Sequence, residues 1–199
     1  MIEEKIYKNL KEKYGFLSSW AIWKLPTSTP KSNTGDLSIF DMPDLLLKLN
    51  PNYVFVGLNV SNTHGNKGIN EKNIWSNFHS SYKYQNDYKL RYALMNTKYW
   101  GSYMTDIIKK YPEVDSNKVK LFLKQNPNIV KQNIEEFKSE MTILNYILKP
   151  VLIAMGDTTY KILDKYLSNE FKIVKIMHYS NMIGAKEYRK TVLEALKNI

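Results

Sequence analysis

Cysteine is absent from this chain of 199 residues. Its absence excludes disulfides, thiolate zinc sites, iron–sulfur clusters and a cysteine nucleophile. A metal site would have to use histidines and carboxylates, but His64, His79 and His178 are far apart in the sequence and form no HExxH pair. We therefore expect neither a metal nor any other cofactor.

The short motifs of several large enzyme classes are missing as well. A phosphate-binding loop requires GxxxxGK followed by Ser or Thr, and neither GNKGIN nor GDTTYK supplies that spacing. The dinucleotide fingerprint GxGxxG and the serine-hydrolase elbow GxSxG do not occur. What remains is chemistry performed by Asn, Asp and His side chains in polar loops.

Long hydrophobic runs are also lacking. No stretch approaches the roughly 18 apolar residues of a membrane-spanning helix. The first residues, MIEEKIYKNLKEKYG, carry charges throughout and contain no apolar core of the kind found in a signal peptide. We expect a cytoplasmic protein that has no membrane partner.

Positive charge and aromatic rings, in contrast, are plentiful. Lys and Arg number 29 against 19 acidic residues, which gives a formal net charge of +10, and aromatic residues make up 13% of the chain. Cations attract the phosphates of nucleic acids, and bases stack on aromatic rings. The alternative is a lysine-rich protein with ordinary surfaces, and composition alone does not separate the two.

Helical and extended patterns alternate along the chain, which is typical of an α/β sandwich with a mainly parallel sheet in a single domain, residues 1–199. The sequence predicts helices over residues 2–14, 43–49, 84–96, 116–148 with a break near Pro127, 157–167 and 184–196. Extended segments are expected at residues 19–25, 53–58, 101–108, 151–155 and 171–177.

Three loops at the ends of expected strands have unusual polar content. GLNVSNTHG follows the strand at 53–58, TDII ends the strand at 101–108, and HYSNMIG follows the last strand. In parallel sheets, ligands bind at the carboxyl ends of the strands, where such loops converge. We expect the functional site there.

Taken together, these loops resemble the uracil-DNA glycosylase superfamily. Members carry a Gly-x-Asp-Pro or Gly-x-Asn-Pro loop after one strand and a His-Pro-Ser-Pro-Leu or Asn-Pro-Ser-Gly-Leu loop before the last helix. The first motif resembles residues 57–60 here and the second resembles residues 178–182. The resemblance covers about residues 50–199 and implies a three-layer α/β/α sandwich with a central, mainly parallel four-stranded sheet.

The resemblance assigns catalytic roles to Asn59 and His178. Asn59 would hold a water with its side-chain oxygen and aim it at C1′ of a flipped nucleotide, as in the Asn-bearing, mismatch-specific and single-strand-selective branches. His178 would donate a hydrogen bond to the departing base as negative charge develops on it. The alternatives are that Asn59 caps the loop backbone and that His178 is a structural residue.

Binding roles follow from the same resemblance. Ser180 and Asn181 would contact DNA, with Ser180 gripping a phosphate, and Met182 would push an apolar wedge into the duplex unless it is packed in the core. The first loop has Val60, and the second has Tyr179 and Asn181, where the family has prolines, so both loops lose rigidity.

The base itself would be held by the first motif and by two further positions. Gly57 and Leu58 would line the pocket, and Phe78, or Trp75 in its place, would stack on the base. Either ring could instead be a core anchor. Asp106 stands where the classical branch has a base-reading Asn, and an ionised carboxylate only accepts hydrogen bonds, so it would favour a base with an exocyclic amine. The alternative is that Asp106 caps the following turn.

We therefore expect a monomeric, monofunctional DNA base glycosylase that hydrolyses the N-glycosidic bond of a flipped, deaminated base such as uracil. Its partner would be single-stranded DNA or a mismatched duplex. Lys67 leaves a lyase mechanism open. Two other functions also remain open, namely a weakly active or inactive nucleic-acid-binding protein with the glycosylase fold, and a hydrolase of small nucleosides or nucleotides.

Overall fold

The computed structural model describes residues 2–60, 74–80, 82, 84–109, 111, 113, 115–144 and 149–199. Its strands are β1 (Ser19–Trp20), β2 (Asn50–Asn59), β3 (Ser102–Ile108), β4 (Val151–Met155) and β5 (Ile173–Ile176). Its helices are α1 (Glu4–Tyr14), the 3-10 helix η1 (Leu37–Asp41), α2 (Leu45–Lys48), α3 (Asp87–Leu94), α4 (Ser116–Gln125), α5 (Pro127–Leu144), α6 (Asp157–Leu167) and α7 (Ala185–Ala195).

The strands form one mixed sheet in the order β1-β3-β2-β4-β5. The four strands from β3 to β5 run parallel, whereas β1 lies antiparallel to β3 at the edge. The expected α/β class is confirmed, but the expectation of four strands was wrong, because β1 adds a fifth. Only two residues of the segment 19–25 pair in it, which is too short for an alternating pattern to predict a strand.

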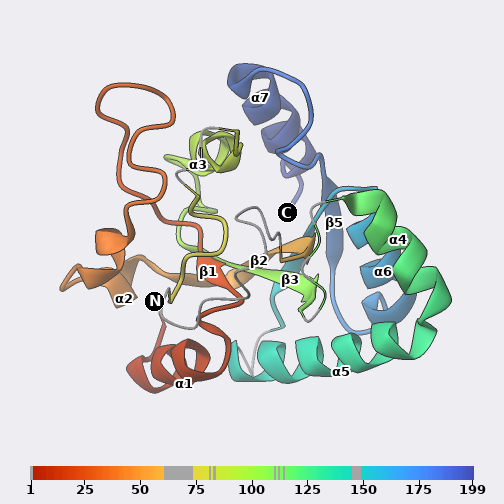
Figure 1. Cartoon of the computed structure of the whole chain (residues 1–199). Helices are drawn as coiled ribbons and strands as arrows, with labels where there is room; N and C mark the ends of the chain where they lie inside the picture. Colours follow the sequence, from red (N-terminus) through yellow and green to blue (C-terminus); the bar gives the residue numbers. More distant parts are fainter. Residues whose placement is uncertain are drawn as a thin grey trace.

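Helices lie against both faces of the sheet (Figure 1). Alternate strand residues point to opposite faces, so Val54 and Val56 join a buried cluster with residues of α1, α5 and α6. Phe55 lies between them and joins a second cluster with residues of α3 and α7. No helix within the described ranges is long and apolar enough to cross a membrane.

Most predicted elements are present with shifted ends. The break near Pro127 is confirmed, since α4 ends at Gln125 and α5 begins at Pro127, where the missing N–H costs no helical hydrogen bond. The helix predicted for residues 84–96 is shorter, and the strand predicted for residues 53–58 is longer at both ends.

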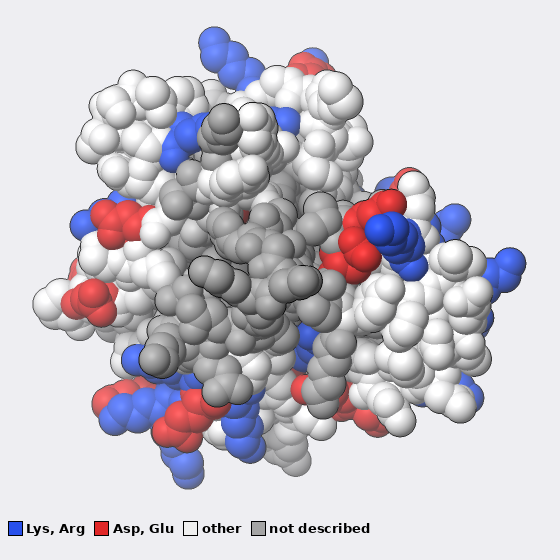
Figure 2. All heavy atoms as spheres, in the orientation of Figure 1, with Lys and Arg blue, Asp and Glu red and all other residues white. Residues whose placement is uncertain are grey.

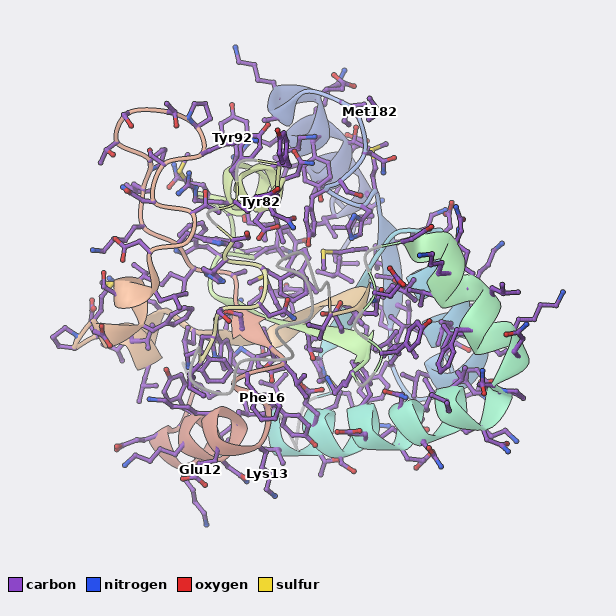
Figure 3. All side chains as sticks on the ribbon, viewed as in Figure 1. Glu12, Lys13, Phe16, Tyr82, Tyr92 and Met182 are labelled. Carbon is purple, nitrogen blue, oxygen red and sulfur yellow. The ribbon has the colours of Figure 1, made fainter. Side chains whose placement is uncertain are left out.

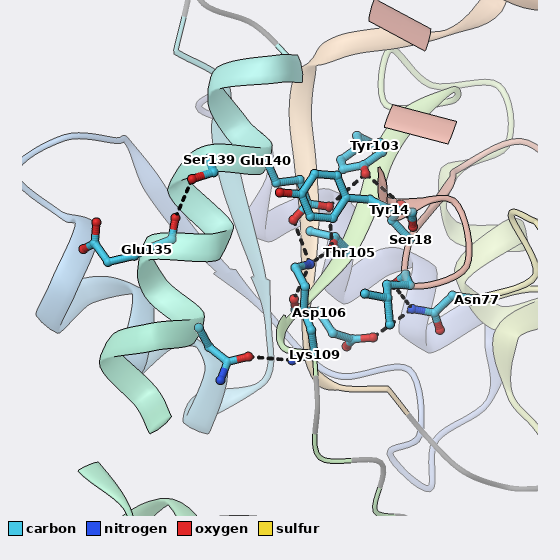
Figure 4. Close-up of polar contacts among 12 residues, drawn as sticks. Tyr14, Ser18, Asn77, Tyr103, Thr105, Asp106, Lys109, Glu135, Ser139 and Glu140 are labelled. Atoms are coloured by element: carbon cyan, nitrogen blue, oxygen red, sulfur yellow. Dashed lines mark hydrogen bonds and ion pairs between the residues drawn. The ribbon is translucent and has the colours of Figure 1, made fainter. Parts of the chain in front are cut away.

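A buried ion pair joins α5 to β3. Nζ of Lys109 lies 2.7 Å from Oε2 of Glu140, and both side chains are fully buried. The other carboxylate oxygen, Oε1, accepts hydrogen bonds from the hydroxyls of Tyr103 at 2.8 Å and Thr105 at 3.0 Å (Figure 4). A buried charge is tolerated only when it is paired and hydrogen-bonded, as here.

Removing one partner of this pair should be strongly destabilising. We expect Glu140→Ala to lower the free energy of unfolding by about 3–5 kcal/mol, because it leaves the Lys109 ammonium buried without a counter-ion. Glu135→Ala, in the same helix, is the matched control, since the Glu135 side chain is 75% exposed and lies 3.9 Å from Lys138; its cost should be below about 1 kcal/mol. Urea denaturation measures both values. Similar losses in the two variants would contradict the assignment.

Candidate functional site

A cleft of about 1110 Å³ lies at the carboxyl ends of the parallel strands. Asn59 contributes from the end of β2, Asp106 from β3, Gly156 from the end of β4 and Met177 from the end of β5. This is the edge of a parallel sheet at which ligands are expected to bind. The cleft thus lies at the edge of the sheet that the polar loops of the sequence indicate.

Most of the predicted site residues line this cleft, although they come from four separate segments of the chain. The predicted residues found in its lining are Leu58, Asn59, Phe78, Asp106, His178, Ser180 and Asn181. Gly57 is buried next to them, whereas Trp75 and Met182 are not part of the lining.

Asn59 is anchored through its side-chain nitrogen. Nδ2 donates to the backbone oxygens of Val60 and Tyr111, both at 3.2 Å, and of Glu113 at 2.7 Å. These contacts agree with the capping alternative, because they tie the end of β2 to the segment after β3. They use only the nitrogen, and within the described ranges no donor bonds to Oδ1. The anchored amide therefore still has an oxygen that can accept a hydrogen bond.

The hydrogen bonds around His178 indicate which nitrogen carries its proton. The backbone N–H of Ser180 donates to Nδ1 at 3.2 Å, and Oγ of Ser180 lies 2.8 Å from the same nitrogen. Desolvation lowers the pKa of His178 to about 4, so the ring is neutral at pH 7. With Nδ1 accepting, the proton of the neutral ring is on Nε2. Nε2–H is then a hydrogen-bond donor.

The loop that carries His178 is held at two points. Asn181 folds back, with Nδ2 donating to the backbone oxygen of His178 at 3.0 Å. The backbone oxygen of Asn181 accepts a 2.9 Å hydrogen bond from Nζ of Lys89, which reaches across from α3. These contacts supply part of the rigidity that the absent prolines would have given.

Met182 lies next in this loop and is fully exposed, at 102% of its reference area. Figure 3 shows it on the outer side of the loop that leads into α7. The alternative that Met182 is packed in the core is therefore wrong. An exposed methionine beside a cleft has the freedom to insert into a partner.

Phe78 lines the cleft in a left-handed backbone conformation, with φ of 63°. This conformation is uncommon for a bulky residue and has to be held by its surroundings. Oδ1 of Asn77 accepts from the backbone N–H of Phe78 at 3.1 Å, and the indole of Trp23 donates to its carbonyl at 3.2 Å. The ring lies edge-on to Tyr179, with centroids 6.5 Å apart.

Asp106 lies on β3, and its carboxyl group and the Phe78 ring both lie beside Gly57 of the adjacent strand β2. Its Oδ2 accepts a 2.8 Å hydrogen bond from Nδ2 of Asn77 (Figure 4). A Cβ atom at Gly57 would lie 2.1 Å from Oδ1, so a larger residue at position 57 would require this carboxyl group to move. The alternative that Asp106 caps the following turn is not what the contacts show, because the carboxyl is bound by Asn77 and lines the cleft.

Two buried carboxyl groups lie in this region with altered acidity. Burial raises the pKa of Asp106 to about 6, opposed by the hydrogen bond from Asn77 and the charge of Lys109. Burial also raises the pKa of Asp87 to about 6, opposed by the backbone N–H of Ser80, which donates to its Oδ2 at 2.8 Å. Asp106 is part of the described lining, whereas Asp87 is not.

Trp75 lies in the core and not in the cleft. Its side chain is 1% exposed, Nε1 donates to the Tyr7 hydroxyl at 2.8 Å, and the ring packs against Trp20 and Phe40. The core-anchor alternative holds for this residue, so a stacking role for Trp75 is a prediction that its position does not support. Phe78 is also a core residue, 6% exposed within the second buried cluster, although it borders the cleft.

Two residues of the cleft were not singled out from the sequence. Asn77 binds both Asp106 and Phe78, and it also donates to the backbone oxygen of Leu17 at 2.8 Å. Tyr179 stacks on the ring of His178 with centroids 4.4 Å apart. Tyr179 lies within the second loop motif and Asn77 directly precedes Phe78. Only these neighbours could have suggested the two residues, because neither residue type is diagnostic alone.

Charge in the cleft is mixed. Its acidic and lysine lining residues within the described ranges are Asp106, Glu113, Asp157, Lys120 and Lys175, and Asp157 pairs with Lys175 at 2.8 Å. Figure 2 shows Lys and Arg spread around the margin of one face, with acidic residues among them. The net positive charge of the chain is therefore not concentrated in this lining.

Some expectations fall on other parts of the chain. Outside the described residues are His64 and Lys67, both of which follow the first motif. Within the described ranges, no group of three or more His, Asp or Glu side chains could hold a metal ion.

The state of His178 can be measured directly. We expect nitrogen NMR to show Nε2 protonated at pH 7 and the ring to titrate near pH 4. Because the folded pKa lies below the unfolded value of about 6.5, the unfolded chain binds more protons between these values, and this residue lowers stability as the pH falls through that window. The control is the same protein in urea, where titration should return to about pH 6.5. A folded-state pKa near 6.5 would contradict the assignment.

Comparison of the chain with protein-family models, with curated proteins and with solved structures found no match. The residues of the cleft and the two loop motifs are therefore the features that bear on function.

Proposed function

We propose that the protein is a DNA glycosylase that hydrolyses the N-glycosidic bond of a flipped base. One observation carries the proposal: a single cleft brings together Asn59, His178 and the Phe78 ring, which the motif resemblance had assigned to catalysis and base stacking. On this proposal the fold is the three-layer sandwich of the uracil-DNA glycosylases, with β1 as an addition at the edge of the sheet.

The reaction requires two functions of these side chains, namely a water aimed at C1′ and a hydrogen-bond donor to the departing base. Oδ1 of Asn59 accepts a hydrogen bond from a water and directs its oxygen toward C1′, while Nδ2 keeps the amide in place. As the C1′–N bond breaks, its electron pair leaves with the base, and Nε2–H of His178 donates to a base oxygen that gains negative charge. The water oxygen bonds to C1′ and its proton passes to solvent or to the released base.

A neutral His178 suits this role. An imidazole that keeps its proton on Nε2 donates to the developing anion without carrying a positive charge into the cleft before the base arrives. Phe78 offers a ring on which a base can stack, worth roughly 1–3 kcal/mol. Ser180 and Met182, on the loop at the edge of the cleft, would contact the phosphate backbone and fill the space left by the flipped base.

A nucleic-acid-binding protein without turnover is the second candidate. It is favoured by the absence of loop prolines that would stiffen the catalytic residues. The hydrogen bonds from Lys89 and Asn181, which hold the His178 loop, argue for the catalytic alternative, because a positioned donor is what the reaction requires.

An oligonucleotide assay separates the two. Single-stranded and mismatched oligonucleotides, end-labelled and carrying one uracil, hypoxanthine, xanthine or cytosine, are incubated with the protein and treated with hot alkali to reveal abasic sites. We expect cleavage at one kind of base, lowered about a hundredfold in Asn59→Ala and in His178→Gln, with DNA binding retained. Asn117→Ala, an exposed asparagine on α4, is the control and should keep full activity.

The variants need a folding check, because Asn59 also ties two backbone segments together. Thermal unfolding of His178→Gln, whose side chain is only partly buried, should match that of the unchanged protein. Salt-sensitive DNA binding without cleavage at any base would favour the second candidate. Cleavage unaffected by both substitutions would place the reaction elsewhere.

A further inference from the structure

Two exposed aromatic rings lie in the lining of the cleft, on the segment between Phe78 and α3. Tyr82 and Tyr84 both belong to this lining, and the two residues are 42% and 68% exposed. Their rings meet edge-on, with centroids 5.4 Å apart and an angle of 71° between the ring planes. A contact of this kind leaves at least one face of each ring uncovered by the other ring.

Large apolar side chains with this much exposure are few in the chain. Within the described ranges they are Leu25, Leu47, Tyr82, Tyr84, Leu121 and Met182. The two tyrosines line the cleft, and Met182 directly follows Asn181, which also lines it. Apolar side chains that are exposed singly need no explanation, whereas a group of them beside a cleft indicates contact with a partner.

The charge of the lining does not favour phosphate contacts as the main source of affinity. Lys120 and Lys175 share the lining with three acidic residues, one of which, Asp157, pairs with Lys175. Stacking of a base on an aromatic ring does not require charge, and each stacked base raises affinity by roughly fivefold to a hundredfold. The exposed rings therefore offer this cleft a source of affinity that its charges do not.

The position of the tyrosines limits which base they can reach. Tyr82 follows Phe78 by four positions in the sequence, so their Cα atoms are at most about 14 Å apart. A base on Tyr82 would then come from the same short stretch of strand as a base on Phe78. The bases of a duplex are paired and stacked on each other, whereas those of a single strand can turn their faces to a protein ring.

We propose that Tyr82 and Tyr84 form a stacking subsite for an unpaired base that neighbours the flipped one, and that the substrate of the cleft is consequently single-stranded DNA. This inference rests on the proposed function and narrows it, because the two loop motifs leave single strands and mismatched duplexes equally open. The flipped base lies at Phe78 and its neighbour lies at the tyrosines. The subsite accepts any base, because every base has a face that can stack.

Fluorescence anisotropy tests the subsite without requiring turnover. The ligand is a short labelled single strand with one uracil between adenines, compared with the same strand in a duplex that is mismatched at the uracil. We expect the single strand to bind at least about tenfold more tightly, and Tyr82→Ala combined with Tyr84→Ala to weaken its binding at least about fivefold. Phe at both positions keeps the rings and should retain the affinity. Leu47→Ala, at an exposed residue outside the lining, is the control.

A second comparison assigns the loss to the neighbouring bases. Abasic sites in place of the adenines beside the uracil should weaken binding to the unchanged protein by a similar factor, and should cost nothing further in the double alanine variant. Equal affinity for single strand and duplex, unchanged binding by the alanine variant, additive losses, or no binding of any strand would overturn the inference. Ring-dependent binding of single strands without cleavage of any oligonucleotide would instead count against the proposed reaction and leave the subsite intact.

Discussion

The buried pair of Lys109 and Glu140 is the interaction on which the position of the cleft depends. It joins α5 to β3 on one face of the sheet, and the alternation of side chains along β3 then directs Asp106 to the opposite face. Lys109 is paired with Glu140, and its charge opposes but does not cancel the effect of burial, which raises the pKa of Asp106 to about 6. A scaffold contact on one side of the sheet thereby sets the electrostatics of the site on the other side.

The α/β class was predictable because it rests on apolar runs and helical periodicity that packing follows closely. The strand at 151–155 and the helix break before Pro127 are examples, since a proline and a compact apolar run each have one favoured structure. An extended segment was expected at residues 19–25, but its place in the sheet was not predictable, because the two residues of β1 pair with Met104 and Tyr103, far along the chain. Pairing of that kind leaves no mark in the local sequence.

The residues of the site also fall into those that the sequence indicates and those that it does not. Asn59 and His178 could be singled out because each lies at the end of an expected strand, in a loop that carries one of the two motifs. Asn77 could not be singled out, because its importance comes from its contacts. It bonds to Leu17 and Asp106, which are distant in the sequence, and to the backbone of Phe78, which has a rare conformation. The burial of Trp75 could not be predicted either, because a tryptophan near a polar loop can pack in the core or stack on a ligand. The sequence thus identified candidate chemistry, and tertiary contacts decided which side chains share the cleft.

The close approach of Gly57 and Asp106 has an evolutionary consequence. Since any Cβ at position 57 would overlap the carboxyl group, a larger residue there is compatible only with a smaller or displaced side chain at position 106. Position 57 therefore cannot gain a side chain unless the carboxyl group at position 106 moves or is lost. Among relatives of this chain, the two should vary as a pair across adjacent strands, and an alanine at position 57 would mark a lineage that has given up the carboxyl in its cleft.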